Sequence, residues 1–371
     1  AGKVNGARVQ PLDPRSGRRD ADGQAPTIDV KARAVVNATG IWADELRSVD
    51  HVTDRHELRP AKGIHLSVAR HKVPCDVAAI IPVRQDKRSI FVVPWGEHTY
   101  LGTTDTDYEG PLDDPAVTEQ DVAYIINAVN GVVDKPISAA DVTGTWAGLR
   151  PLLAGQPGKH KPSERTADLS RRHRVIGDAD GLVTITGGKL TTYRKMAEDT
   201  VDALADVLGH KLAPCPTRRL RLRGAEGAAS LGKASTEPEL QRLAERYGGE
   251  AAAVFGLTTE DPALLEPLVP GLPHIAAEAV YAVRYEMAQC LEDVLARRTR
   301  AVLFSAEQAR IAAPKVAALL GAELDWSEER QEAEVAALGQ YLDQELQALG
   351  RTDAGERHDS TPGDPVIGVG S

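Results

Sequence analysis

Apolar and polar residues alternate along much of the first half of the chain. Ile64, Leu66 and Val68 would point to one face of a strand, and His65 and Ser67 to the other. Similar short runs over residues 77–83, 89–93 and 99–103 predict antiparallel strands, the last two joined as a hairpin. The pattern therefore predicts a mainly antiparallel sheet over residues 57–110.

From about residue 238 onward, the apolar residues recur instead at helical spacing. One stripe predicts a single helix over residues 276–298, and its members are Val280, Val283, Met287, Leu291 and Val294. Ser327 is placed to cap a last helix through Val335, Leu338, Leu342 and Leu346. Thr118 and Asp121 fit a capping box for an earlier helix over residues 118–130. The pattern thus predicts an all-helical region after the sheet.

Two apolar runs end at small residues and are followed by helical spacing. The first run enters the turn Asn37, Ala38, Thr39 and Gly40, and the second enters Gly187, Gly188, Lys189, Leu190 and Thr191. Strand-to-helix junctions of this kind lie where α/β folds place cofactors, and a helix N-terminus favours an anion. Plain turns remain the alternative interpretation for both segments.

A hairpin and one further strand complete the predicted local structure. Residues 4–9 and 28–34 read as a hairpin across a polar loop at 11–26, with the second strand half-buried. Residues 142–153 read as a strand in which Pro151 keeps Arg150 extended. A guanidinium in this apolar strand needs a partner, which is either a protein carboxylate or an anionic ligand. His65 is either a structural histidine or a catalytic one.

Composition narrows the class of protein. The 371 residues suffice for two or three domains, and 42% hydrophobic content is ordinary for a globular protein. The net charge of −10 disfavours a nucleic-acid partner. Three widely separated cysteines suggest neither a disulfide framework nor a metal site, so we expect a reducing cytosol. We find no run of 18 apolar residues and no signal peptide in this sequence.

Several sequence blocks occur together in one order, and their combination carries more information than any one of them. They are VVNATGIWAD, RPAKGIHL, FVVPWGEHTYLGTTDTDYEG, TWAGLRPL, SRRH, TGGKLTTYR and AVRYEMAQCLEDVLARRTR. Over residues 30–346 the chain thereby resembles the FAD-dependent glycerol-3-phosphate dehydrogenases of the D-amino-acid-oxidase-like flavoprotein group. The resemblance implies an α/β FAD-binding domain interleaved with an antiparallel-sheet substrate domain, followed by an all-α C-terminal domain.

The resemblance also implies domain limits. We expect the FAD-binding domain at residues 1–56 and 171–210, the substrate domain at 57–170, the helical domain at 211–350, and a disordered tail at 351–371. The GxGxxG turn with which the family begins does not occur in the 371 residues. We therefore expect that the chain lacks roughly the first third of the family's length, including the N-terminal βαβ unit of the FAD-binding domain.

The resemblance assigns roles to individual residues. It implies oxidation of sn-glycerol 3-phosphate to dihydroxyacetone phosphate, with His65, Lys189 and Arg150 as catalytic residues. The substrate would contact Arg150, Arg171 and Thr191, because paired arginines suit a phosphate dianion. FAD would contact the two turns, that is, Asn37, Ala38, Thr39, Gly40, Gly187, Gly188, Lys189, Leu190 and Thr191. No metal is implied.

The same resemblance suggests partners and a location. Electrons would pass from FAD to a membrane quinone, and the protein would be cytoplasmic or peripheral on the inner face of the cell membrane. The resemblance leaves open whether the protein forms a homodimer. Two other classes remain: a related FAD-dependent oxidase of an amine or hydroxy substrate, and a non-catalytic truncated remnant.

Overall fold

The structure is a computed structural model that describes residues 3–10, 27–49, 58–83, 88–153, 172–178, 180–227 and 237–351. The predictions for Arg171, for the loops at 11–26 and 154–169 and for the tail after residue 351 lie outside these residues. We call residues 3–49 and 172–208 the α/β part, residues 58–153 the sheet part, and residues 237–351 the helical part.

The α/β part contains a hairpin and a small mixed sheet. The hairpin pairs β1 (Gly6–Val9) with β2 (Ile28–Lys31) in antiparallel orientation, as predicted. The sheet has the order β10-β11-β3, and its strands are β10 (His173–Gly177), β11 (Leu182–Gly187) and β3 (Val35–Asn37). Four helical segments follow these strands: η1 (Gly40–Trp42), α1 (Ala43–Val49), η4 (Leu190–Thr192) and α3 (Tyr193–Leu208).

One expectation for the hairpin is wrong. The alternation in residues 28–34 predicted a half-buried strand, but all four residues of β2 are exposed. The β1–β2 ribbon forms a separate two-stranded sheet. Among the described residues, no layer buries the face that carries Ile28 and Val30.

The sheet part is antiparallel, with strand order β5-β6-β7-β4-β8 and β9 paired to the other side of β4. Its strands are β4 (Leu58–Ala69), β5 (Ala79–Pro82), β6 (Ser89–Trp95), β7 (His98–Gly102), β8 (Thr106–Asp107) and β9 (Val142–Leu153). Its helices are α2 (Glu119–Asn130) and the short η2 (Ala139–Asp141). The antiparallel arrangement was predicted.

The core of this part forms between β4 and α2. Ile64, Leu66 and Val68 are fully buried in one cluster with the apolar stripe of α2, which consists of Val122, Ile125, Ile126 and Val129. The predicted capping box is present: Thr118 Oγ1 accepts from the amide of Asp121 at 3.2 Å, and Asp121 accepts from the amide of Thr118 at 3.1 Å. The opposite face of β4, which carries His65, is thereby left for the site.

The helical part contains α5 (Pro238–Tyr247), η5 (Gly248–Glu250), α6 (Ala251–Glu260), η6 (Pro262–Leu265), α7 (Ala276–Glu286), η7 (Asp293–Arg298), α8 (Ala301–Phe304), α9 (Ala306–Leu324) and α10 (Glu328–Gln347). The last helix is confirmed, because Ser327 Oγ accepts from the amide of Arg330 at 3.2 Å. Leu338, Leu342 and Leu346 are buried in the helical core, as the pattern predicted.

The single helix predicted over residues 276–298 is wrong. The chain leaves α7 at Met287, which has a left-handed φ of 58° and is 81% exposed. The guanidinium of Arg298 donates to the carbonyl oxygen of Glu286 at 2.5 Å and so satisfies a group at the end of α7. Residues 293–298 then form a π-helical turn. The sequence pattern did not predict the end of α7, because Met287 is apolar and continues the helical spacing.

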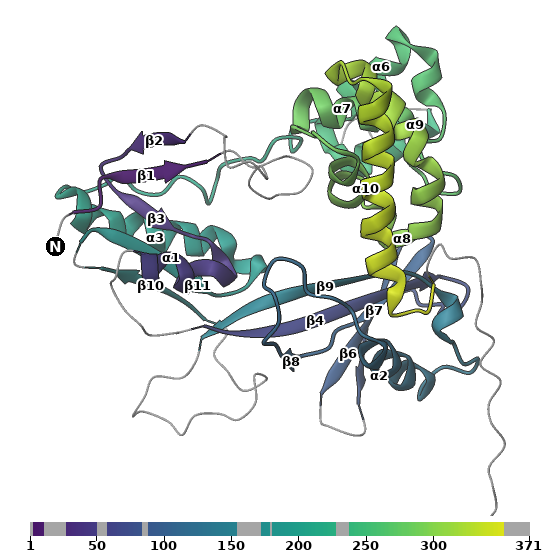
Figure 1. Cartoon of the computed structure of the whole chain (residues 1–371), viewed down its shortest axis with the longest axis horizontal. Coiled ribbons are helices and arrows are strands. Elements are labelled where there is room, and N and C mark those ends of the chain that lie inside the picture. Colours follow the sequence, from purple (N-terminus) through teal and green to yellow (C-terminus); the bar gives the residue numbers. More distant parts are fainter. Residues whose placement is uncertain are drawn as a thin grey trace, which may run out of the picture.

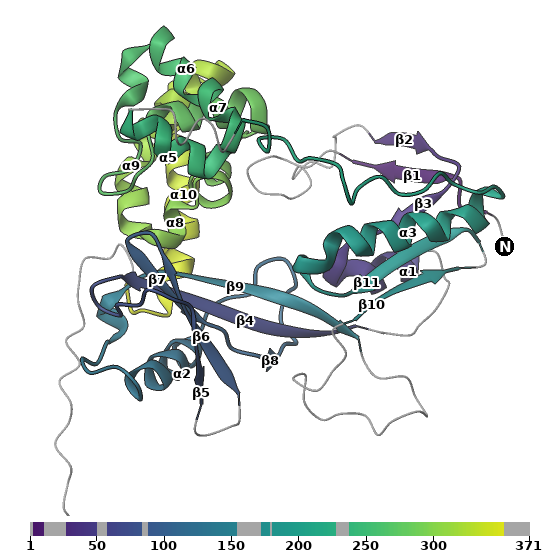
Figure 2. The same cartoon turned by 180° about the vertical axis from the view of Figure 1, so that it is seen from behind.

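The long strand pair β4–β9 links the other regions. In both views it extends from the α/β part to the region beneath the helical part (Figures 1 and 2). The pairing of Leu58 with Leu153 lies at the α/β end, where Leu153 approaches Gly187, and that of Ser67 with Gly144 lies at the helical end, where Gly144 approaches Leu303. A residue's position along this pair therefore determines which region it faces.

Candidate functional site

The two predicted strand-to-helix junctions are confirmed and lie at the same edge of one sheet. Strand β3 pairs in parallel with β11, with Asn37 opposite Thr184. The carboxyl ends of adjacent parallel strands point the same way. The turn after Asn37 and the turn after Gly187 therefore lie beside each other, in the position where α/β folds bind cofactors.

The first turn is held by the side chain of Asn37. This buried amide donates to the carbonyl oxygen of Ala43 at 2.9 Å, and its oxygen accepts from Thr39 Oγ1 at 2.7 Å. Ala38 and Thr39 are exposed, and Gly40 has a φ of +64° with no atom within 4 Å of the place a Cβ would occupy. Asn37 thus shapes the turn, while the backbone after it is open to a ligand.

The second turn requires both of its glycines. Gly187 and Gly188 have φ angles of +71° and +81°, which favour glycine. A Cβ on Gly187 would lie 2.7 Å from the carbonyl oxygen of Arg172. Beyond them, Lys189 and Thr191 are exposed, and Leu190 is 87% exposed. A tight glycine turn followed by exposed side chains fits the edge of a flat cofactor ring.

Arg150 lies on the sheet face opposite the core. Its Nη2 donates to Thr103 Oγ1 at 2.9 Å, its Nη1 donates to the carbonyl oxygen of Thr104 at 3.2 Å, and Asp105 lies 3.6 Å away. A Cβ on Gly63 would lie 2.3 Å from Nη2, so the guanidinium occupies the space that this glycine leaves. A protein carboxylate near Arg150 is therefore present, and an additional anionic ligand stays a prediction.

His65 lies on the same face, two residues along β4 from Gly63. On β4 it is paired with Trp146 of β9 and Gly102 of β7. A Cβ on Gly102 would lie 2.5 Å from the His65 ring, which therefore needs this glycine. Burial, and secondly the charge of Arg150, lower the pKa of His65 from 6.5 to about 4. The imidazole is neutral at neutral pH and can accept a proton.

The structure therefore forms two groups from the predicted residues. Arg150 and His65 share one face of the β4–β9 pair, and the two turns share one sheet edge that includes Lys189 and Thr191. The groups approach each other where the Leu153 side chain lies 3.2 Å from the Cβ position of Gly187. Arg171 lies outside the described residues.

Sequence reasoning missed three residues of this site, namely Gly63, Gly102 and Trp146. The block RPAKGIHL carried a signal, because Gly63 and His65 have the two-residue spacing of one strand face. The contribution of Gly102 and Trp146 depends on the pairing of strands far apart in sequence, which no local pattern shows.

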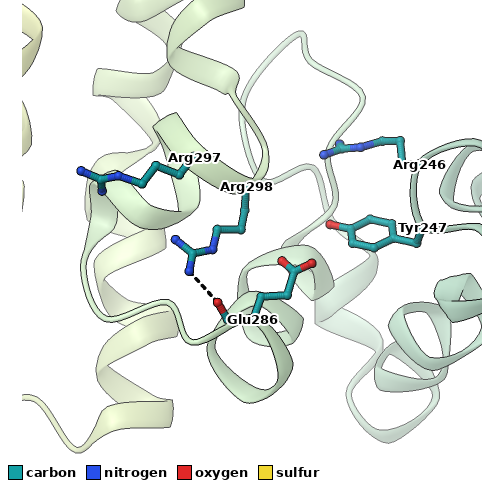
Figure 3. A pocket seen from close by; sticks show the side chains of 5 residues that line it. All are labelled: Arg246, Tyr247, Glu286, Arg297 and Arg298. Carbon is teal, nitrogen blue, oxygen red and sulfur yellow. Dashed lines mark hydrogen bonds between the residues drawn. The ribbon is translucent and has the colours of Figure 1, made fainter. Parts of the chain in front are cut away.

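A cavity of about 440 Å³ lies in the helical part, apart from the sheet site. It is lined by Arg246, Tyr247, Glu286, Arg297 and Arg298, whose side chains come from three helical segments (Figure 3). The arginines are already paired with carboxylates. Arg246 lies 2.8 Å from Glu278, and Arg298 and Arg297 lie 2.7 and 3.1 Å from Asp293. We therefore interpret the side chains around this cavity as a structural ion-pair network.

Comparison with known proteins now identifies the class and the family. The open turns at the carboxyl ends of parallel strands define a cofactor-binding α/β protein. The chain belongs to the FAD-dependent oxidoreductase family, which matches residues 3–194. Residues 215–331 match the C-terminal domain of alpha-glycerophosphate oxidase. The fold class expected from the sequence is thereby confirmed.

Named relatives are similar to most of the chain. It is 39% identical to glycerol-3-phosphate dehydrogenase 2 of Mycobacterium tuberculosis, over 86% of the chain and 55% of that relative. It is 33% identical to the mitochondrial glycerol-3-phosphate dehydrogenase of Mesocricetus auratus, over 93% of the chain and 49% of that relative. The chain thus spans about half the length of these relatives.

A solved structure shows the same fold. The glycerol-3-phosphate dehydrogenase of Bacillus halodurans, solved in complex with FAD, superposes with a TM-score of 0.75 at 31% identity. The match covers 95% of this chain and 68% of that one. Within the described part of our chain, no helix is long and apolar enough to cross a membrane. No group of three or more metal-binding side chains occurs in that part either.

Proposed function

We propose that the protein oxidises sn-glycerol 3-phosphate to dihydroxyacetone phosphate with FAD as cofactor. The observation that carries this proposal is the position of Arg150 beside His65 on a strand pair whose end meets the Gly187 turn. This arrangement supports Arg150 as a cation for the phosphate and His65 as a base for the hydroxyl, on a strand pair that reaches a cofactor-type turn. Family membership and the names of the relatives support the same reaction.

The two turns are the proposed cofactor contacts. Asn37, Ala38, Thr39 and Gly40 form one, and Gly187, Gly188, Lys189, Leu190 and Thr191 form the other. Exposed backbone and the exposed side chains of Leu190 and Tyr193 suit the polar edge and apolar face of a flavin. When bound, FAD would accept the hydride from C2 of the substrate.

Arg150 and Arg171 are the proposed phosphate contacts, with Thr191 nearby. Arginine presents a planar set of donors that matches phosphate oxygens. Lys189, at the start of η4, would stabilise negative charge that develops on the substrate oxygen or on the reduced cofactor. The guanidinium of Arg150 fills the space that Gly63 leaves by having no side chain, which supports a fixed orientation for Arg150.

His65 is the proposed base that takes the proton of the C2 hydroxyl. In the free protein it is a weak base, because burial and the charge of Arg150 lower its pKa to about 4. A phosphate dianion bound at Arg150 would offset that charge and raise the pKa of the imidazole. Substrate binding would therefore strengthen the base in the same step that positions the hydroxyl.

We further propose a quinone as the electron acceptor, peripheral membrane association, and the domain limits given by the resemblance. We also propose that the protein forms a homodimer. An oxidase of an amine or hydroxy substrate is the alternative function, and rapid reoxidation by oxygen rather than by a quinone analogue would favour it. A non-catalytic remnant is the third, favoured if the chain stays colourless after incubation with FAD.

The test begins with the full chain incubated with FAD and freed of excess cofactor. Glycerol 3-phosphate added under anaerobic conditions should bleach the flavin absorbance, and glycerol without phosphate should bleach it far more slowly. Retained flavin with no bleaching by glycerol 3-phosphate would contradict the proposed reaction for this chain. Chemical assay of dihydroxyacetone phosphate checks the product.

A further inference from the structure

A row of aromatic rings leads from His65 along the sheet face to the helical part. The imidazole of His65 and the indole of Trp146 stack with centroids 5.1 Å apart and planes inclined by 9°. Tyr100 meets the indole edge-on at 5.0 Å, and Phe304 of α8 stacks on Tyr100 at 5.9 Å. The row thus connects the proposed base to a different region of the molecule.

Small residues on the strands make this row feasible. Tyr100 on β7 and Gly144 on β9 both pair with Ser67 on the intervening strand β4. The small side chain of Ser67 lets the rings of Tyr100 and Trp146 meet across β4. Gly102, opposite His65, leaves the space that the imidazole fills. Large aromatic rings therefore lie opposite glycine or serine on the neighbouring strands of this site.

The helical part lies directly on the end of this strand pair. Ser67 Oγ donates to the carbonyl oxygen of Leu303, and a Cβ on Gly144 would lie 2.6 Å from the same oxygen. This close approach of backbone to sheet fixes α8, and with it Phe304, over β4 and β9. The ring of Phe304 can consequently hold Tyr100 in place.

We infer that Trp146 is a positioning residue, whose indole holds the imidazole of His65 in a single orientation. Tyr100 in turn holds the indole, and Phe304 holds Tyr100, so that the helical part contributes to the geometry of the site. The inference rests on the proposed role of His65 as the base. It adds three aromatic residues, Trp146, Tyr100 and Phe304, on which the orientation of His65 depends.

The physical reason is the parallel stack. A flat indole covers one face of the imidazole, excludes water from it and restricts its rotation. Among the described residues, the charge of Arg150 of β9 lowers the pKa of His65 directly, and the charge of Arg300 lowers the pKa of Tyr100. Burial keeps Tyr100 neutral by raising its pKa to about 12. Removing the indole would therefore change the environment of His65 mainly through hydration and freedom of rotation.

The first experiment measures His65 without depending on activity. The full chain, incubated with FAD, is labelled with ¹³C-histidine, and the His65 signal is assigned by its loss in His65→Gln. Trp146→Ala should raise the pKa of His65 by about one pH unit or more, because water reaches the ring. Trp146→Phe keeps an aromatic face and should shift it by less than about half a unit. Phe304→Ala should shift it in the same direction as Trp146→Ala, but less.

Trp95→Ala is the matched control. Trp95 stacks on Tyr100 at 5.6 Å and is 48% exposed. Its removal should leave the His65 titration unchanged. Trp146→Leu, which keeps an apolar side chain on β9, replaces Trp146→Ala if the latter does not fold. An unchanged His65 pKa in Trp146→Ala or Trp146→Leu overturns the inference, as does an equal shift in Trp95→Ala.

The second experiment follows flavin reduction by glycerol 3-phosphate as a function of pH. Misplacing the base should lower the limiting rate constant in Trp146→Ala on the order of 10- to 100-fold. The KM should change by no more than about twofold, because the phosphate contacts remain. Trp146→Phe should recover most of the rate. A loss confined to KM would contradict the positioning role. If no variant or wild type reduces flavin, the proposed function fails, and the titration of His65 still decides the role of Trp146.

Discussion

The molecule holds two arginine-bearing sites that differ in the partners of their charges. On the sheet face, Arg150 donates to a hydroxyl and a carbonyl oxygen, and Asp105 lies 3.6 Å from it. In the helical cavity, Arg246 and Arg298 lie 2.8 and 2.7 Å from carboxylates. Counting arginines would rank the helical cavity higher, but its charges are already paired at short distance.

The second difference is how each site is built. The sheet site seats Arg150 and His65 in the space that Gly63 and Gly102 leave, on a strand pair whose other end meets the Gly187 turn. The helical site is built on Glu278, a carboxylate only 1% exposed. We conclude that the sheet site is arranged to bind and the helical site to hold helices together. The predictions below test this contrast, from the largest expected effect to the smallest.

Removing the buried carboxylate should have the largest effect. Glu278 accepts from Tyr247 at 2.9 Å and lies 2.8 Å from Arg246. Burial works to raise its pKa, but His274 and Arg246 outweigh burial and lower it. Glu278→Ala leaves these groups unpaired and should reduce the free energy of unfolding by about 3–5 kcal/mol in urea titrations.

Glu286→Gln is the control for that variant, since Glu286 lines the same cavity without building it. It should leave the urea midpoint nearly unchanged. The rate of flavin reduction per folded molecule should be unaffected in both variants. A loss of stability in Glu278→Ala below about 1 kcal/mol would show that the network does not hold the helices.

Arg150→Ala should have the next largest effect, and on substrate binding rather than on stability. Losing a charge-assisted contact to phosphate costs about 1.5–3 kcal/mol, so the KM for glycerol 3-phosphate should rise about 10- to 150-fold. Arg298→Ala, which removes an arginine from the other site, should leave the KM unchanged. Equal effects of the two substitutions would abolish the distinction between the sites, and an unchanged KM in Arg150→Ala would reject the phosphate contact.

The same contrast explains what the sequence could predict. Apolar residues recur at every second position on β4 and at every third or fourth position on α2 and α10. This repeat predicted the three elements, because one face of each is buried. The two glycine turns were predicted because they follow apolar runs directly. The stack of His65 on Trp146 was not predictable, since it depends on a strand register that joins residues 81 positions apart.

The failures also have physical causes. Met287 continued the apolar stripe, but this residue itself has a left-handed backbone conformation and ends α7. Helical spacing alone cannot reveal such a change of chain direction. The residues of β2 alternated like a half-buried strand, although all four of them are exposed in a separate two-stranded sheet. Both errors arose where a local pattern was taken to imply a tertiary contact.

Glu345 tests the junction between the two regions. This residue of α10 lies 3.3 Å from Thr145 of β9, and burial raises its pKa from 4.5 to about 7. A raised folded-state pKa means that stability is present at low pH and is lost as the pH rises through about 7.

Glu345→Gln removes this titration. Relative to the wild type, the variant should gain about 1–2 kcal/mol in the free energy of unfolding between pH 5 and pH 8. The exposed Glu332 of the same helix provides the control, because Glu332→Gln should show no such pH dependence. A difference that stays constant over this pH range would show that Glu345 is ionised throughout.

The smallest effect should come from the exposed edge of the helical cavity. The side chain of Arg297 is 50% exposed and pairs with Asp293 at 3.1 Å and with Glu292. Exposed ion pairs contribute about 0–1 kcal/mol, so Arg297→Met should change the urea midpoint little. Arg246→Met removes the cation beside the buried Glu278 and should cost clearly more, because that carboxylate loses its partner. If the two substitutions cost the same, burial of Glu278 is not what distinguishes the network, and the helical cavity would have to be reconsidered as a binding site.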